Sequence, residues 1–187
     1  MHDFRYIRGR LFCEGVSVES LARKYGTPLY VYSAITLRDH FGKLDRALAP
    51  LDHMICYAVK ANSNLSILKL LAGEGAGFDI VSGGELHRVR AACASARRCI
   101  FAGVGKTRAE IEQGLRAGIL AFNVESEEEL RLIDQVARRL GKRAPVSIRV
   151  NPGVDAGTHR KITTGTSANK FGTPFNQIRR LYQRASR

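Results

Sequence analysis

A repeated alternation of short apolar runs with amphipathic segments restricts the fold of this chain more than any other feature of its sequence. Each run has the length of a buried strand and is followed by apolar positions at helical spacing. The units repeat at a pitch of roughly 22 to 25 residues, which predicts βα units and a parallel sheet. The runs hardly alternate between apolar and polar, as expected where both faces of a sheet are covered. The runs are 54–59, 78–81, 99–102, 120–124 and 146–150.

Two architectures fit this pattern, a doubly wound sheet and a (β/α)8 barrel. No GxGxxG motif follows the first run, which weighs against a dinucleotide-binding fold. The stretch 151–172 interrupts the rhythm, because it is rich in Gly, Thr and Asn and lacks periodicity; so long a connection is typical of a functional segment. Residues 1–30 precede the rhythm and predict a separate lead-in, with a strand at 11–13 and a short helix at 18–25.

Capping residues mark where four of the helices begin. A side-chain oxygen at these positions accepts a hydrogen bond from the first turn, and a glutamate three residues later completes a capping box. The predicted caps are Ser33, Thr107 with Glu110, Ser126 with Glu129, and Thr173 followed by a first-turn Pro174.

Composition and charge exclude several classes of protein. The 187 residues include 30 Lys and Arg against 17 Asp and Glu, a net charge of +13, and seven basic residues but no acidic one lie in 156–187. No apolar stretch reaches the roughly 18 to 20 residues of a membrane span. The four cysteines lack CxxC spacing, and the N-terminus has no apolar core of a signal peptide. We expect a cytoplasmic protein with reduced thiols and no metal site. Interleaved aromatics and an RNP-like block are missing, so we expect no nucleic-acid partner.

The densest chemical signal is the segment Tyr57-Ala58-Val59-Lys60-Ala61-Asn62. Lysine is rarely buried without a role, and Lys60 comes at the carboxyl end of the first run, where active sites of (β/α)8 barrels lie. Among apolar neighbours its amine would be a nucleophile, suited to a Schiff base with an aldehyde cofactor. Spacing alone leaves a second reading open, in which the lysine ends the strand with its ammonium in solvent.

This segment, with Ile67, Leu68, Leu71 and Gly75 after it, resembles the pyridoxal-phosphate attachment signature of the group IV decarboxylases, the fold-type III enzymes related to alanine racemase. Within that group the chain is most similar to the diaminopimelate decarboxylases, and the resemblance runs from about residue 5 to Tyr182. Four blocks carry it: 26–32, 78–86, 148–155 and 158–172.

The resemblance implies an α/β fold, a partial (β/α)8 TIM-type barrel of about five of eight βα units over residues 31–187. The lead-in, 1–30, would join a C-terminal β-domain that this sequence does not contain. The family's His-Ile-Gly-Ser and Glu-Pro-Gly-Arg blocks are also missing. We therefore expect the first part of a larger two-domain enzyme, inactive by itself.

The same resemblance implies roles for four residues. Lys60 would hold pyridoxal 5'-phosphate covalently, and Asp79 would lie near the cofactor and influence the protonation of Lys60. Arg149 would face the rim of the cofactor, and His159 would border the substrate. Each of the last three has a simpler reading: a turn residue for Asp79, a structural ion pair for Arg149 and a solvated loop residue for His159.

The reaction implied is decarboxylation of meso-2,6-diaminopimelate to L-lysine, a step of lysine biosynthesis. The family forms a homodimer, which we do not expect this chain to form by itself. Three alternatives remain open: a non-catalytic barrel that carries pyridoxal phosphate, an inactive fragment, and a basic protein that binds nucleic acid. The first would bind the cofactor without decarboxylation, and the last would be retained on nucleic acid in a salt-sensitive way.

Overall fold

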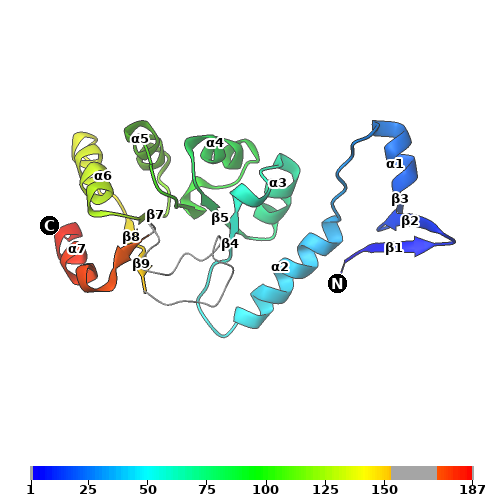
Figure 1. The fold of residues 1–187 in the computed structure, drawn as a ribbon, viewed down its shortest axis with the longest axis horizontal. Coiled ribbons are helices and arrows are strands. Elements are labelled where there is room, and N and C mark those ends of the chain that lie inside the picture. The colour runs from blue at the N-terminus through cyan, green and yellow to red at the C-terminus, as the bar shows by residue number, and fades with distance from the viewer. Residues whose placement is uncertain (1, 153–171, 187) are drawn as a thin grey trace.

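The lead-in forms a small sheet of its own in the computed structural model, which describes residues 2–152 and 172–186. Strands β1 (Phe4–Ile7), β2 (Arg10–Cys13) and β3 (Val16–Ser17) pair antiparallel in that order. Helix α1 (Val18–Tyr25) follows, and Ser17 caps it. The predicted strand and short helix are thus confirmed. This part lies at one end of the molecule, beyond α2 (Ala34–Leu48) (Figure 1).

The predicted apolar runs form one parallel sheet. Its order is β4-β5-β6-β7-β8, so every strand lies beside the next one in sequence. Paired residues are 21 positions apart in the first three pairings and 24 in the last. A doubly wound sheet would reverse its order at a switch point, so the sequential order identifies a partial barrel. The strands are β4 (Cys56–Ala58), β5 (Gly77–Ile80), β6 (Cys99–Phe101), β7 (Ala121–Val124) and β8 (Val146–Ile148).

Helices that follow the strands lie in a row on one side of this sheet (Figure 1). This one-sided arrangement is that of the outer ring of a (β/α)8 barrel. None of the helices in the described part of the chain is long and apolar enough to cross a membrane. The helices are α3 (Leu65–Gly73), α4 (Gly83–Ala91), α5 (Arg108–Ala117), α6 (Glu127–Arg139) and α7 (Ile178–Ala185), with 3-10 turns at Val59–Ala61, Ala96–Arg98 and Phe175–Gln177.

The core lies between the sheet and this row of helices. Phe78, Phe101 and Phe122 are fully buried there, one from each of the three central strands. The alternate positions, such as Asp79 and Asn123, are only partly buried. The strands therefore alternate in burial, which differs from the expectation of two covered faces, because no described element covers the second face.

Two predicted helix starts are confirmed in full. Ser33 Oγ accepts from Thr36 N–H at the start of α2, and Thr107 with Glu110 forms a complete capping box at α5. At α6 the box is only half present. Ser126 Oγ accepts from Glu129 N–H, but the Glu129 carboxylate accepts from Glu125 N–H, one residue before the cap. Helix α4 begins in the same way, with Glu85 accepting from Val81 N–H, one residue before its cap Ser82.

The predicted cap at Thr173 is wrong. Thr173–Pro174 is a short strand, β10, parallel to β9 (Val150–Asn151), and α7 begins four residues later at Ile178. Thr173 N–H donates to Arg149 O at 2.7 Å. This bond draws the backbone into extended pairing, which the local pattern could not reveal.

Candidate functional site

Charged side chains gather at the carboxyl ends of the strands. Lys60 comes two residues after β4, Asp79 lies in β5, and Arg149 directly follows β8. The register pairs Asp79 with Ala58 on one side and Ile100 on the other. Because all strands of the sheet are parallel, the three charged residues lie on the same side of it, at the carboxyl ends of the strands, which we call its carboxyl edge.

Lys60 lies in the 3-10 turn Val59–Ala61, immediately behind β4. The turn buries Val59 completely and leaves Lys60 exposed. The expectation that apolar neighbours surround this lysine is wrong for the described part of the chain. Its amine is instead accessible at the edge of the sheet.

Asp79 is a partly buried carboxylate on which the charge of Lys60 acts. Burial raises its pKa above the ordinary value, and the positive charges of Lys60, Arg149 and Lys106 act in the opposite direction. Three cations thus act on one half-buried carboxylate. Lys60, Arg149 and Lys106 are therefore all near enough to Asp79 for their charges to act on its carboxylate.

Lys106 is a buried cation that the sequence reasoning missed. Its side chain is 1% exposed, and Nζ donates to Gly103 O at 2.7 Å, to Asn123 O at 2.8 Å and to the Glu129 carboxylate. The three donors of the ammonium are therefore all used. Lys106 joins the loop after β6 to the end of β7 and the start of α6.

Glu125, directly after β7, is the second group that was missed. Its side chain is 4% exposed; Oε1 accepts from Arg149 Nη1 at 3.0 Å and Oε2 from Gly172 N–H at 3.1 Å. Arg149 thus forms the ion pair of its simpler reading, yet 39% of its side chain stays exposed. Position behind a predicted strand, the signal that singled out Lys60, would also have found Glu125.

His159 lies outside the described residues. Lys60, Asp79 and Arg149 offer a donor set that suits pyridoxal phosphate: an accessible primary amine for an aldehyde, and cations for an anionic group. Two small residues lie at the same carboxyl ends of the strands: Ala58 ends β4, and Gly103 follows β6. The described residues therefore fit this cofactor.

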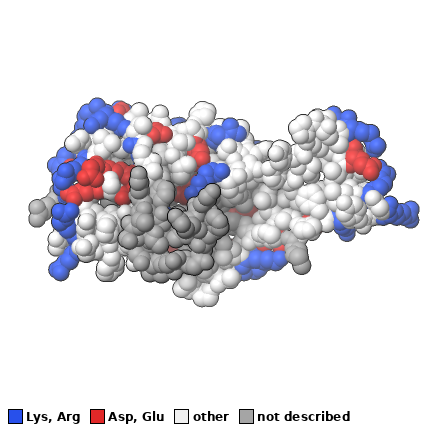
Figure 2. Space-filling model, viewed as in Figure 1, with Lys and Arg blue, Asp and Glu red and all other residues white. Residues whose placement is uncertain are grey.

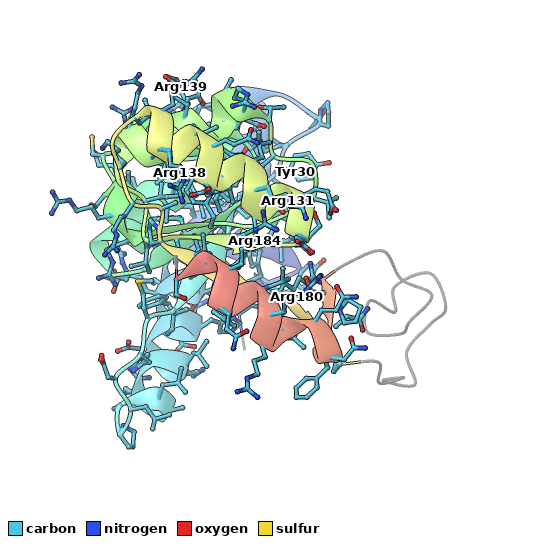
Figure 3. The ribbon with its side chains drawn as sticks, turned by 90° about the vertical axis from the view of Figure 1, so that its left-hand side faces the viewer. Tyr30, Arg131, Arg138, Arg139, Arg180 and Arg184 are labelled. Atoms are coloured by element: carbon cyan, nitrogen blue, oxygen red, sulfur yellow. The ribbon has the colours of Figure 1, made fainter. Side chains whose placement is uncertain are left out.

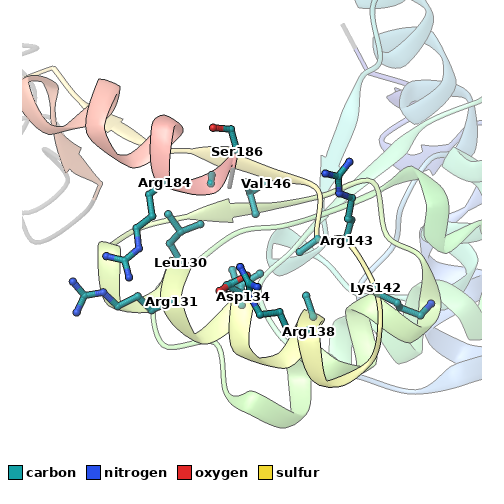
Figure 4. Close-up of a pocket in the computed structure, with 13 residues that line it drawn as sticks. Leu130, Arg131, Asp134, Arg138, Lys142, Arg143, Val146, Arg184 and Ser186 are labelled. Atoms are coloured by element: carbon teal, nitrogen blue, oxygen red, sulfur yellow. Dashed lines mark hydrogen bonds and ion pairs between the residues drawn. The ribbon is translucent and has the colours of Figure 1, made fainter.

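A separate cavity of about 520 Å³ lies between α6 and α7, away from this edge (Figure 4). Val146, the first residue of β8, lines it, so it belongs to the amino ends of the strands. Arg131 of α6 and Arg184 of α7 also line it (Figure 3). Both bind Glu127. Figure 2 shows acidic side chains among Lys and Arg at this end of the molecule. The cavity is not the site that Lys60 marks.

Comparison with known proteins agrees with the motif analysis. Residues 35–187 match the family described as pyridoxal-dependent decarboxylase, pyridoxal binding domain. The chain is 50% identical to a diaminopimelate decarboxylase of Pseudomonas fluorescens over 187 residues, all of this chain and 45% of that protein. It is 54% identical to one of Neisseria meningitidis serogroup B over 176 residues, 94% of this chain and 42% of that protein.

Solved structures give the same result. Diaminopimelate decarboxylase from M. jannaschii, crystallised with L-lysine, superimposes with a TM-score of 0.89 at 38% identity, covering 98% of this chain and 44% of that one. The Helicobacter pylori enzyme with L-lysine gives 0.87 at 43% identity, covering 90% and 43%. The chain thus spans less than half the length of the relatives it matches.

Proposed function

Because this chain belongs to the pyridoxal-dependent decarboxylase family through its pyridoxal binding domain, we propose that it supplies the cofactor-binding part of a diaminopimelate decarboxylase. The reaction would be decarboxylation of meso-2,6-diaminopimelate to L-lysine. The observation that carries the proposal is the grouping of Lys60, Asp79 and Arg149 at the carboxyl edge of the sheet, in a chain about half identical to enzymes of that name.

Each residue has a distinct part in this proposal. Lys60 Nζ, exposed behind β4, holds the cofactor at its aldehyde carbon. Asp79 is close enough to Lys60 for their charges to interact, so its carboxylate stabilises the protonated amine when the lysine is free. Arg149 offers its guanidinium to an anionic group of the cofactor. When bound, the cofactor supplies an electron sink for the charge left as carbon dioxide departs.

A small molecule is the proposed partner, rather than a nucleic acid. The basic side chains of α6 and α7 are largely engaged with acidic ones: Glu127 alone accepts from Arg131, Arg180 and Arg184. Their charge is therefore partly neutralised within the fold. A cytoplasmic location, and a homodimer for the protein as a whole, complete the proposal.

The proposed attachment of the cofactor to Lys60 can be tested by reducing the bond and identifying the modified lysine. The 187-residue chain is incubated with pyridoxal phosphate, reduced with borohydride and digested, and the modified peptide is identified by mass. We expect the adduct on Lys60, its loss in Lys60→Ala, and its retention in Lys69→Ala, which removes an exposed lysine of α3. An adduct that persists in Lys60→Ala would contradict the assignment.

Substrate identity needs a separate measurement. Meso-diaminopimelate, which competes for the cofactor aldehyde, should change the cofactor absorbance at lower concentration than L-ornithine does. Cofactor binding with equal responses to both amino acids would favour the non-catalytic carrier instead.

A further inference from the structure

Four charged side chains form one continuous series of contacts along the carboxyl ends of β6, β7 and β8. Lys106 Nζ donates to Glu129 Oε1, and Glu129 Oε2 accepts from Glu125 N–H at 2.8 Å. Glu125 Oε1 then accepts from Arg149 Nη1 at 3.0 Å. A cation lies at each end of the series and two carboxylates lie between them, joined through the Glu125 backbone N–H, so the series has no net charge.

Burial divides this series into two parts. The side chains of Lys106, Glu129 and Glu125 are 1%, 9% and 4% exposed, whereas that of Arg149 is 39% exposed. Buried charges are costly unless they are paired and hydrogen-bonded, and here each is. Arg149 is the most exposed of the four, and the three buried members form its support.

We infer that Glu125 is a positioning residue, which fixes the Arg149 guanidinium at the end of β8 so that it faces the anionic cofactor. The inference rests on the function proposed above. It adds a residue that acts through Arg149 and does not itself touch the cofactor. A carboxylate is suited to this task because it accepts at both oxygens at once.

The second oxygen of Glu125 strengthens the argument. Oε2 accepts from Gly172 N–H at 3.1 Å, and Thr173 N–H donates to Arg149 O at 2.7 Å. The guanidinium and the backbone of Arg149 are thus both held, one by Glu125 and the other by the strand that Glu125 anchors. Neither the side chain nor the main chain of Arg149 can shift without breaking one of these bonds.

A double-mutant cycle tests the inference on the 187-residue chain. Glu125→Gln removes the charge with little change of shape, Arg149→Met removes the guanidinium, and the double variant combines them. Glu128→Gln is the matched control, because Glu128 is exposed and in the same helix start. The dissociation constant for pyridoxal phosphate is measured by absorbance titration, and folding by thermal unfolding.

We expect Glu125→Gln to weaken cofactor binding about tenfold, because a charge-assisted bond is lost. Arg149→Met should weaken it at least as much, and the double variant no further than Arg149→Met alone. Glu128→Gln should bind as the unaltered chain does. A purely structural Glu125 would lower the unfolding temperature but leave the affinity of the folded protein unchanged.

Two results would overturn the inference: affinity of Glu125→Gln equal to that of Glu128→Gln, or losses that multiply in the double variant. If Glu125→Gln does not fold, Glu125→Asp takes its place, because it keeps the charge. A loss of cofactor affinity smaller than that of Arg149→Met would support the inference. An unchanged affinity would oppose it. Failure of the unaltered chain to bind the cofactor would instead refute the proposed function, and the inference with it.

Discussion

Gly114 lies in α5 with the ring of Phe122 directly against it. A Cβ added at Gly114 would lie 2.8 Å from Phe122 Cζ and 3.1 Å from Cε1. Phe122 is fully buried, and its ring stacks on that of Phe101 with centroids 6.0 Å apart. Since neither ring has room to retreat, the close approach of α5 to β7 requires a residue without a side chain.

Gly114→Ala should destabilise the fold. Alanine favours a helix by about 1 kcal/mol over glycine, but overpacking a rigid core costs about 1–3 kcal/mol. The free energy of unfolding, measured in urea, should therefore fall. Gly73→Ala in α3 is the control, because nothing lies within 4 Å of the added carbon, and it should be neutral or stabilising. Equal effects of the two substitutions would contradict this packing argument.

Sequence reasoning found the residues of the candidate site whose position and neighbours form a motif, Lys60, Asp79 and Arg149. It missed Lys106 and Glu125, because a lysine or glutamate in a chain rich in charged residues is by default a surface residue. Their burial arises from tertiary contacts: Lys106 meets Asn123 O and Glu129, and Glu125 meets Arg149 and Gly172. Position behind a predicted strand could single out Glu125, but these pairings join segments far apart in the sequence, and no local pattern encodes them.

At the scale of the elements, one carboxylate serves the starts of two helices. Glu110 accepts from Thr107 N–H at 3.0 Å and Thr107 Oγ1 at 2.8 Å, which completes the cap of α5. It also accepts from Gly83 N–H at 2.9 Å, in the first turn of α4. The bonds from Gly83 and Thr107 lower the pKa of Glu110, with the Gly83 bond the largest cause.

This lowered pKa makes a pH-dependent prediction. A carboxylate with a depressed folded pKa contributes stability above its unfolded pKa of about 4.3, and loses it as pH falls through the folded value. The stability difference between the unaltered chain and Glu110→Gln should therefore shrink below about pH 4.3. Urea unfolding at pH 6 and at acid pH measures it. If the unfolding free energies of the two proteins changed with pH in parallel, the charge of Glu110 would not stabilise the starts of α4 and α5.

Elements with complete local signals were predictable, and those shaped by distant partners were not. The capping box of Thr107 and Glu110 is confirmed because all its bonds lie within four residues. At Ser126 the box is incomplete, because the Glu129 carboxylate accepts from the backbone N–H of Glu125, one residue before the cap. Thr173 lies in a strand and not at a helix cap, because its N–H donates to Arg149 O.

The whole described molecule has an open sheet. β4 pairs only with β5 among the described residues, so it presents one backbone edge. On the outer side of β8, Ile148 N–H donates to Tyr182 Oη, and β9, which follows directly, pairs with β10. Unpaired edges template pairing with other chains. The net charge of +13 opposes such contact by repulsion at low ionic strength.

We therefore expect the 187-residue chain to self-associate, and more so in salt. Sedimentation velocity at rising protein concentration should show growing mass, with a larger fraction associated in about 0.5 M salt than at low salt, because screening removes the repulsion. A monomer at every concentration in both conditions would mean that the edge is protected.

The sequential strand order also sets how the chain can reach this fold. Each strand pairs with the one before it after 21 or 24 residues, so every pairing closes a short loop and contact order is low for a parallel sheet. During synthesis at about 5–20 residues per second, a new unit emerges about every one to five seconds. Each unit finds the edge of its predecessor already in place, and the sheet can grow on the ribosome in the order of translation.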